Sequence, residues 1–119
     1  MAWPVDFYTE DDGAAPVEAF LDALAKQHRA KVVARIRLLE ELGVELPFPY
    51  SSQVRGRLRE LRARFGKDRM RVLYFADSRR WFILLHGVIK RTEKLAESDI
   101  RTAEARMQRH EEKLARRKP

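Results

Sequence analysis

Two prolines, Pro47 and Pro49, divide the chain into a part with helical periodicity and a part with strand-like alternation. Before them, apolar residues recur at spacings of three and four, which gives a helix one buried face. After them, apolar and basic residues alternate, as they do in a strand with one buried face. Because proline fixes φ and lacks a backbone N–H, residues 44–53 are predicted to form a loop. The two parts together predict an α+β domain.

The expected elements follow the order β-α-α-β-β-β-α. Pro16 favours the start of the first helix and Gly43 the end of the second. Little sequence separates the two helices, so they are expected to form a hairpin. Short polar turns between the later strands favour a small, mainly antiparallel sheet packed on that hairpin, followed by a C-terminal helix. The predicted ranges are a strand at 3–8, a helix from 16, a helix at 30–42, strands at 57–65, 69–76 and 80–89, and a helix at 96–117.

Alternation also predicts which side chains share a face of each strand. In the middle strand, Met70, Val72 and Tyr74 are expected opposite Arg71, Leu73 and Phe75. In the last strand, strict alternation puts five residues on one face: Phe82, Leu84, His86, Val88 and Lys90. Trp81, Phe82 and Tyr74 are expected in the core, with base stacking by Trp81 or Phe82 as the alternative.

The composition favours one domain, residues 1–119, that needs neither a disulfide nor a structural metal for stability. A core at 119 residues and 45% hydrophobic content can sustain a single fold. There is no cysteine, which excludes disulfides, thiolate metal sites and a cysteine nucleophile. The three histidines are too far apart in the sequence to suggest a metal site, and neither a metal nor any other cofactor is expected. No apolar run is long enough for a membrane span and no secretory signal is recognisable, so a cytoplasmic protein is expected.

The formal charge of +7 is unevenly distributed along the chain. Residues 1–50 carry five basic and nine acidic side chains, whereas residues 51–119 carry twenty basic and nine acidic ones. Most of the basic excess falls on the predicted strands and the turn after them. Arginine presents a planar fork of donors that matches phosphate oxygens, so this surface is suited to an RNA backbone. The alternative is a solvated strand face whose charges protect the sheet edge.

Four ordered motifs resemble the RelE superfamily of toxins, and more narrowly its HigB-type branch, which includes phage-derived proteins. They are LRELR at 58–62, MRVLY at 70–74, LLHGVIKRTEK at 84–94 and DIRTAEAR at 99–106. The chain departs from the pattern at Met70, where an aromatic residue is usual. It also has Leu95-Ala96 in place of the usual Thr-Pro, which removes a capping hydroxyl from the last helix.

The resemblance implies a RelE-like fold and a metal-free ribonuclease that cleaves mRNA, usually on the ribosome, and is inhibited by a cognate helix-turn-helix antitoxin. In that chemistry the 2′-OH attacks the adjacent phosphate. The expected catalytic residues are Arg71, Arg62, Lys90 and His86. The expected RNA-binding residues are Arg57, Arg59, Arg64, Lys67, Arg69, Arg91 and Lys94.

Several alternatives stay open at the level of the sequence. His86 is a lone histidine in an apolar strand, which is more often a structural residue than a base. Glu60 is a second candidate base, but pairing with Arg62 is the simpler explanation of its place in the strand. The whole chain also fits a non-catalytic RelE-fold module that binds RNA or a protein partner. A role as a DNA-binding repressor alone is disfavoured because no helix-turn-helix is evident.

Overall fold

The computed structural model describes residues 2–117 and has two α-helices before the main strands and one after them. The first half contains β1 (Val5–Phe7), α1 (Pro16–Ala23), α2 (Lys26–Leu42) and a 3-10 turn, η1 (Gly43–Glu45). The second half contains β2 (Ser51–Arg55), β3 (Leu58–Phe65), β4 (Asp68–Ala76), β5 (Phe82–Lys90) and α3 (Glu97–Arg116). No helix within residues 2–117 is both long and apolar enough to cross a membrane.

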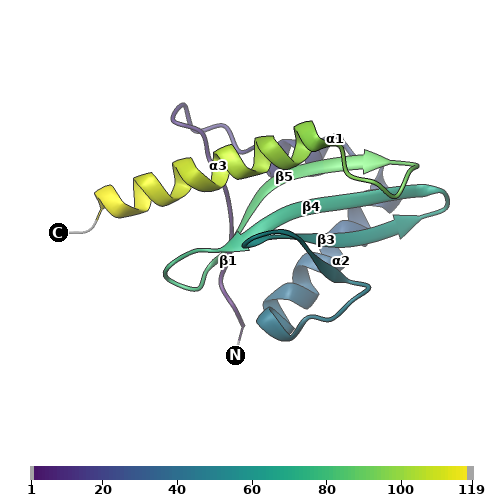
Figure 1. The fold of residues 1–119 in the computed structure, drawn as a ribbon. Coiled ribbons are helices and arrows are strands. Elements are labelled where there is room, and N and C mark those ends of the chain that lie inside the picture. Colours follow the sequence, from purple (N-terminus) through teal and green to yellow (C-terminus); the bar gives the residue numbers. More distant parts are fainter. Residues whose placement is uncertain (1, 118–119) are drawn as a thin grey trace.

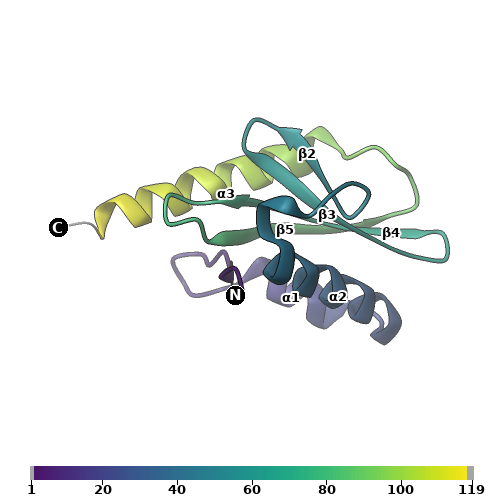
Figure 2. The same ribbon diagram turned by 90° about the horizontal axis from the view of Figure 1, so that it is seen from below.

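The five strands form one sheet in the order β1-β5-β4-β3-β2. β1 pairs with β5 in parallel and every other neighbouring pair is antiparallel. The α1–α2 hairpin covers one face of the sheet and α3 lies on the other (Figures 1 and 2). The predicted α+β fold, with a mainly antiparallel sheet on a helical hairpin and a C-terminal helix, is confirmed.

The structure adds a strand that the sequence did not predict. β2 occupies residues 51–55, most of which were expected in a loop, and pairs with β3 from Ser51 opposite Leu61. Both prolines precede this strand. Its first residues, Ser-Ser-Gln, have little intrinsic preference for a strand, so the sequence gives no local signal for it. Pairing with β3 and a 2.7 Å hydrogen bond between Ser51 Oγ and the Tyr74 hydroxyl hold it in place. α2 also begins at Lys26 instead of 30, because its first turn is polar and carries no apolar signal.

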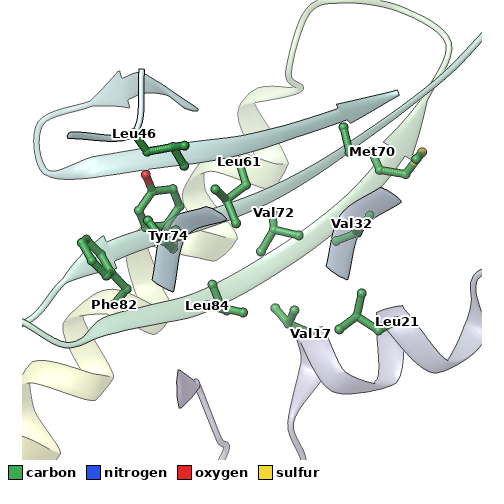
Figure 3. Close-up of a cluster of buried hydrophobic side chains, with 12 residues drawn as sticks. Val17, Leu21, Val32, Leu46, Leu61, Met70, Val72, Tyr74, Phe82 and Leu84 are labelled. Atoms are coloured by element: carbon green, nitrogen blue, oxygen red, sulfur yellow. The ribbon is translucent and has the colours of Figure 1, made fainter. Parts of the chain in front are cut away.

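Two apolar clusters lie on the two faces of the sheet. The larger joins α1 and α2 to the sheet through residues that include Val17, Val32, Met70, Val72 and Leu84 (Figure 3). The smaller lies under α3 and contains Tyr8, Leu58, Leu73, Phe75, Ile83, Leu85 and Ala103. The predicted alternation of β4 is therefore confirmed.

The three aromatic residues predicted to be in the core have different environments. Tyr74 and Phe82 are buried, as predicted, and their rings make an edge contact at a centroid distance of 5.7 Å. The same prediction for Trp81 is wrong. Its side chain is 36% exposed, and the Arg79 guanidinium lies 4.1 Å from its ring centroid. Trp81 belongs to the turn before β5, where it packs against a charged neighbour instead of the sheet.

A β-bulge at Leu85 changes which side chains of β5 share a face. Tyr74 pairs with Leu84 but Leu73 pairs with His86, so Leu85 has no partner across the ladder. The prediction of one continuous face from Phe82 to Lys90 is therefore wrong. Phe82 and Leu84 pack under the helical hairpin, whereas His86, Val88 and Lys90 lie on the face of α3. An extra residue in one strand reverses the alternation beyond it.

Two contacts fit this change of face. The Arg106 Nη1 atom of α3 donates a 2.9 Å hydrogen bond to the Leu85 carbonyl oxygen, which satisfies a group at the bulge. Gly87 now faces the helical hairpin, where a Cβ atom would overlap the ring of Phe20. The bulge thus depends on a donor from one helix and on space beside another.

Asp77 closes the turn between β4 and β5 with a fully buried carboxylate. Its Oδ1 accepts hydrogen bonds from the backbone N–H groups of Arg79 and Trp81. Its Oδ2 accepts from the Arg79 guanidinium at 2.7 Å and from His110 Nε2 of α3 at 3.0 Å. Burial alone raises the pKa of Asp77, but these hydrogen bonds outweigh it and lower the pKa below its usual value.

We expect Asp77 to make the fold acid-sensitive. Because its pKa is lower in the folded chain, its stabilising contribution is complete above the unfolded carboxyl pKa of about 4 and is lost as the pH falls through the folded pKa. Asp77→Asn should lower the free energy of unfolding by about 2 kcal/mol at neutral pH and flatten its dependence on acid. Urea titrations between about pH 3 and pH 7 measure both effects. The exposed Asp22→Asn is the matched control, and an unchanged acid slope in Asp77→Asn would assign the effect to another carboxyl.

Candidate nucleic-acid interface

Basic side chains line up in rows across the sheet on the face of α3. Strand register places Arg62 of β3 directly opposite Arg71 of β4. The next row toward the β3–β4 turn contains Arg64, Arg69 and Lys90, one from each of three adjacent strands. Residues paired across a ladder point to the same face. The register therefore brings together five of the residues that the sequence predicted for catalysis or RNA binding.

Like charges placed directly opposite each other destabilise a sheet unless something neutralises them. Glu93 lies 3.2 Å from Arg69 Nη1, and Glu60 lies 3.4 Å from Arg71 Nε. Within residues 2–117 no carboxylate lies within ion-pair distance of Arg62 or Arg64. The rows thus keep a positive excess that a polyanion would neutralise.

These rows border a cleft of about 230 Å³, which we call the arginine cleft. Five arginines and one glutamate line it. The lining residues are Arg35, Pro49, Tyr50, Arg62, Ala63, Arg64, Arg69, Met70, Arg71 and Glu93. α3 crosses the sheet beside β5 and does not extend over the ends of β3 and β4 next to the β3–β4 turn (Figure 1).

Glu60 and Arg71 form a buried ion pair next to this cleft. The Glu60 Oε2 atom accepts a 2.8 Å hydrogen bond from the Ser52 hydroxyl, while its buried Oε1 has no hydrogen-bond partner among the described residues. The contact of Oε1 with Arg71 Nε is thus an ion pair without hydrogen-bond geometry. The expected pairing of Glu60 with Arg62 is wrong, since the diagonal neighbour across the ladder, Arg71, takes that place. The pair leaves an unsatisfied carboxylate oxygen beside a guanidinium.

His86 and Lys90 belong to a second network, which ties β5 to α3. Both bind Asp99: His86 Nε2 at 2.8 Å and Lys90 Nζ at 2.9 Å. The His86 Nδ1 atom lies 3.1 Å from Arg106 Nη1. Since arginine can only donate, Nδ1 accepts this hydrogen bond and Nε2 donates to Asp99. Burial raises the pKa of Asp99, but hydrogen bonds from His86 and Lys90 outweigh it and lower the pKa.

This network also holds the start of α3. Ala96 precedes the helix and provides no side-chain cap, in line with the replacement of Thr-Pro by Leu95-Ala96. Asp99 in the first turn is instead anchored to the sheet by His86 and Lys90. The position of Lys90 therefore depends on α3.

The remaining predicted RNA-binding residues lie outside the arginine cleft. Arg59 points to the opposite face, where its Nε and Nη2 atoms donate to Ser51 Oγ at 3.2 and 3.1 Å. Arg57 makes two hydrogen bonds to Glu111 of α3, which raise the pKa of Arg57 and lower that of Glu111. Arg91 pairs with Asp68 at 3.2 Å. Lys67 in the β3–β4 turn and Lys94 after β5 are exposed.

Asp68 links the end of the β3–β4 hairpin to α2. It accepts hydrogen bonds from His28 Nε2 at 2.9 Å and from Arg91 Nε at 3.2 Å. These two bonds, the one from His28 first, lower the pKa of Asp68. The β3–β4 hairpin, which carries Arg64 and Arg69, is therefore held by α2 through His28 and by the segment after β5 through Arg91.

Arg35 is a contributor to the cleft that the sequence did not single out. It lies on α2, and its Nε donates a 2.9 Å hydrogen bond to the Arg62 carbonyl oxygen. The Tyr50 carbonyl accepts from the Arg62 N–H at 2.8 Å, so the backbone of Arg62 is held on both sides. Helical periodicity places Arg35 on a polar stripe and gives no sign of this contact. Only the packing of α2 on β3 reveals it.

The model of the family described as phage derived protein Gp49-like (DUF891) matches residues 19–108. The chain belongs to this family. All four RelE-like motifs lie within the matched segment, and the predicted membership of the RelE superfamily of toxins, in a phage-derived branch, is confirmed. The Gp49-like match also covers every residue of the two basic rows.

Among solved structures, this Gp49-like chain is similar to a chain in the crystal structure of the archaeal RelE-RelB complex from Pyrococcus horikoshii OT3. The two are 23% identical, the match covers 73% of this chain and 93% of that one, and the TM-score is 0.45. No curated protein matches.

Proposed function

We propose that the chain is the toxin of a type II toxin-antitoxin system and acts as an endoribonuclease on mRNA. The observation that carries the proposal is the pair of facing arginines, Arg62 and Arg71, in a cleft next to the buried carboxylate of Glu60. Guanidinium groups can orient a phosphate and stabilise the charge that develops on it without a metal ion. Membership of the Gp49-like family supports the same assignment.

In the proposed reaction, a ribose 2′-oxygen attacks the adjacent phosphorus and the bond from phosphorus to the 5′-oxygen breaks. The products are a 2′,3′-cyclic phosphate and a new 5′-OH. Arg62 and Arg71 bind the non-bridging oxygens of the phosphate. Glu60 takes the proton of the 2′-OH through Oε1, which has no hydrogen-bond partner within residues 2–117 and is buried, so the side chain turns toward the cleft to reach the ribose. A water molecule gives a proton to the departing 5′-oxygen.

The other basic residues position the RNA in this proposal. Arg64 and Arg69 extend the basic surface toward the β3–β4 turn, with Lys67 in the turn itself. Lys90 contributes a cation to the same row, and Arg91 and Lys94 follow it on the exposed loop. His86 acts indirectly in this arrangement, because both ring nitrogens already bind protein groups.

The proposed partners are mRNA on the ribosome and a cognate helix-turn-helix antitoxin, and the proposed compartment is the cytoplasm. A positive cleft is suited to the phosphate backbone of a transcript held on a ribosome. An antitoxin that covers the cleft would block the same charges. A short neighbouring gene that encodes a helix-turn-helix protein would support this pairing.

Expression of the chain without an antitoxin tests the proposed function. We expect growth arrest and new 5′-OH ends inside coding regions of transcripts. The ends are mapped by ligation that requires a 5′-OH, in cells that carry the gene or an empty plasmid. Intact transcripts in cells that contain folded protein would contradict the nuclease assignment.

A non-catalytic RNA-binding module is the second candidate. It is favoured by His86, whose nitrogens are both engaged, so that this histidine offers no proton for the leaving oxygen. The module predicts tight, salt-sensitive binding of RNA that stays intact. Cleavage and binding measured on the same oligoribonucleotide separate the two candidates.

A further inference from the structure

The loop of residues 46–50 places two exposed aromatic rings beside the arginine cleft. Phe48 is 68% exposed and Tyr50 is 38% exposed, and the ring of Tyr50 belongs to a residue that lines the cleft. Large apolar side chains this exposed need an explanation when they gather beside a charged site. Neither ring has a role in the proposed cleavage of the phosphodiester.

Each ring is paired with an arginine of the cleft. The Arg62 guanidinium carbon lies 5.0 Å from the Phe48 ring centroid, and that of Arg35 lies 4.7 Å from the Tyr50 centroid. The same Arg62 forms the basic row with Arg71. A phosphate bound to either arginine would therefore lie close to an aromatic ring, which an adjacent base could contact.

The loop is fixed before any ligand arrives. It starts at the buried Leu46 and ends at the buried Ser51, whose hydroxyl bonds Tyr74. Between them, the backbone N–H groups of Tyr50 and Ser51 both donate to the Pro47 carbonyl oxygen, at 3.0 and 3.1 Å. A loop whose backbone is already held in place loses little conformational freedom when its side chains contact a ligand.

We propose that Phe48 and Tyr50 form a base-stacking subsite for the unpaired nucleotides that flank the phosphate in the arginine cleft. The inference rests on the proposed RNA-binding function and specifies its ligand as single-stranded RNA. Nucleic-acid bases stack on aromatic side chains whatever their sequence, while adjacent arginines hold the phosphates. A double helix keeps its bases stacked on each other, so it has no free face for these rings. The charge complementarity of the cleft favours a nucleic acid over an apolar protein segment.

Binding of a labelled, single-stranded 2′-O-methyl oligoribonucleotide by fluorescence anisotropy tests the subsite. The methyl group blocks cleavage, so binding is measured alone. The comparison probe has the same length and charge but lacks bases along its central nucleotides. Phe48→Ala should weaken binding of the first probe about tenfold, since stacking contributes about 1–3 kcal/mol per base and 1.4 kcal/mol is tenfold. Binding of the abasic probe should change less than twofold.

Other variants separate aromatic stacking from simple loss of apolar surface. Phe48→Trp should retain binding of the single-stranded probe and Phe48→Leu should lose it, with Tyr50→Phe and Tyr50→Ala behaving in the same two ways. Val44→Ala is the matched control, because Val44 is 72% exposed but lies outside the arginine cleft. The salt dependence of binding should keep its slope in Phe48→Ala, since no phosphate contact is removed. Thermal melts confirm that each variant is folded.

The proposal is overturned if Phe48→Ala weakens both probes equally, if it weakens neither, or if the unmodified chain fails to bind the single-stranded probe. Unchanged binding would make these rings a contact for a protein partner instead. These results are independent of the nuclease assignment, which is decided by new 5′-OH ends in cells. Stacking-dependent binding without cleavage would support the subsite and reject the nuclease.

Discussion

Replacing Arg71 with glutamine should reduce RNA cleavage by at least about 100-fold and relieve growth arrest. Removing one preorganised donor to a developing negative charge typically lowers a rate by about 100- to 1,000-fold. Arg71 lines the cleft and faces Arg62 across the ladder. Its substitution therefore removes one of the two guanidinium groups proposed to bind the phosphate. The measurement is the yield of 5′-OH ends per folded molecule after induction. Arg62→Ala combined with Arg71→Ala should abolish toxicity.

Folding must be controlled in this experiment because Arg71 also neutralises the buried Glu60. Loss of one partner of a buried pair can destabilise a protein by about 3–5 kcal/mol. Arg71→Lys keeps the charge but loses the fork, so it should fold and still lose most of its activity. The exposed Arg37→Gln is the matched surface control and should stay fully toxic. A double variant at Arg62 and Arg71 that is folded and as toxic as the unmodified chain would show that the assigned site is wrong.

Gly43→Ala should destabilise the fold by about 3 kcal/mol and lower the melting temperature by roughly 10 °C. Gly43 ends α2 with φ +57° and ψ −126°, a conformation that glycine alone adopts without strain. A Cβ atom there would overlap the indole of Trp3. The backbone N–H of Trp3 donates a 2.7 Å hydrogen bond to the Glu40 backbone carbonyl, which holds the N-terminal segment against the same end of α2. Thermal and urea unfolding give the two quantities.

Gly56 provides the matched control for that substitution. It has the same φ of +57°, but a Cβ atom there would meet nothing within 4 Å. Gly56→Ala should therefore show only the backbone cost, about 1 kcal/mol. A larger loss in Gly43→Ala than in Gly56→Ala would show the combined cost of the overlap with Trp3 and of the ψ of −126° at Gly43. Equal losses would mean that the indole moves aside and that backbone strain explains both.

Local patterns predicted most of the fold because each element carries its own signal. The apolar spacing of α1 and α2 and the alternation in β4 are properties of short segments, and both are confirmed. β2 escaped prediction because Ser51 and Ser52 are fixed by their contacts with Tyr74 and Glu60, which come from other strands. Tertiary pairing overrides weak intrinsic preference in such a segment.

The candidate site was predictable as a set of residue types but not as an arrangement. The RelE-like motifs and the phosphate-binding chemistry of arginine singled out Arg62 and Arg71, and the register brings them together. The density of basic residues in β3 predicts RNA binding by Arg59 as well, but this side chain lies on the opposite face of the sheet. Arg35, Phe48 and Tyr50 depend on how α2 and a proline-rich loop pack against β3, which no local pattern encodes.

The bulge at Leu85 makes the length of β5 as important as its composition. Deleting one residue beyond the bulge, such as Val88, would reverse the alternation after that point and turn Lys90 toward the apolar layer under the helical hairpin. Buried charges without partners are strongly unfavourable. We therefore expect β5 to tolerate most substitutions better than a change in the number of residues between the bulge and Lys90. Deletion of Val88 is therefore expected to lower the free energy of unfolding more than the conservative substitution Val88→Ile.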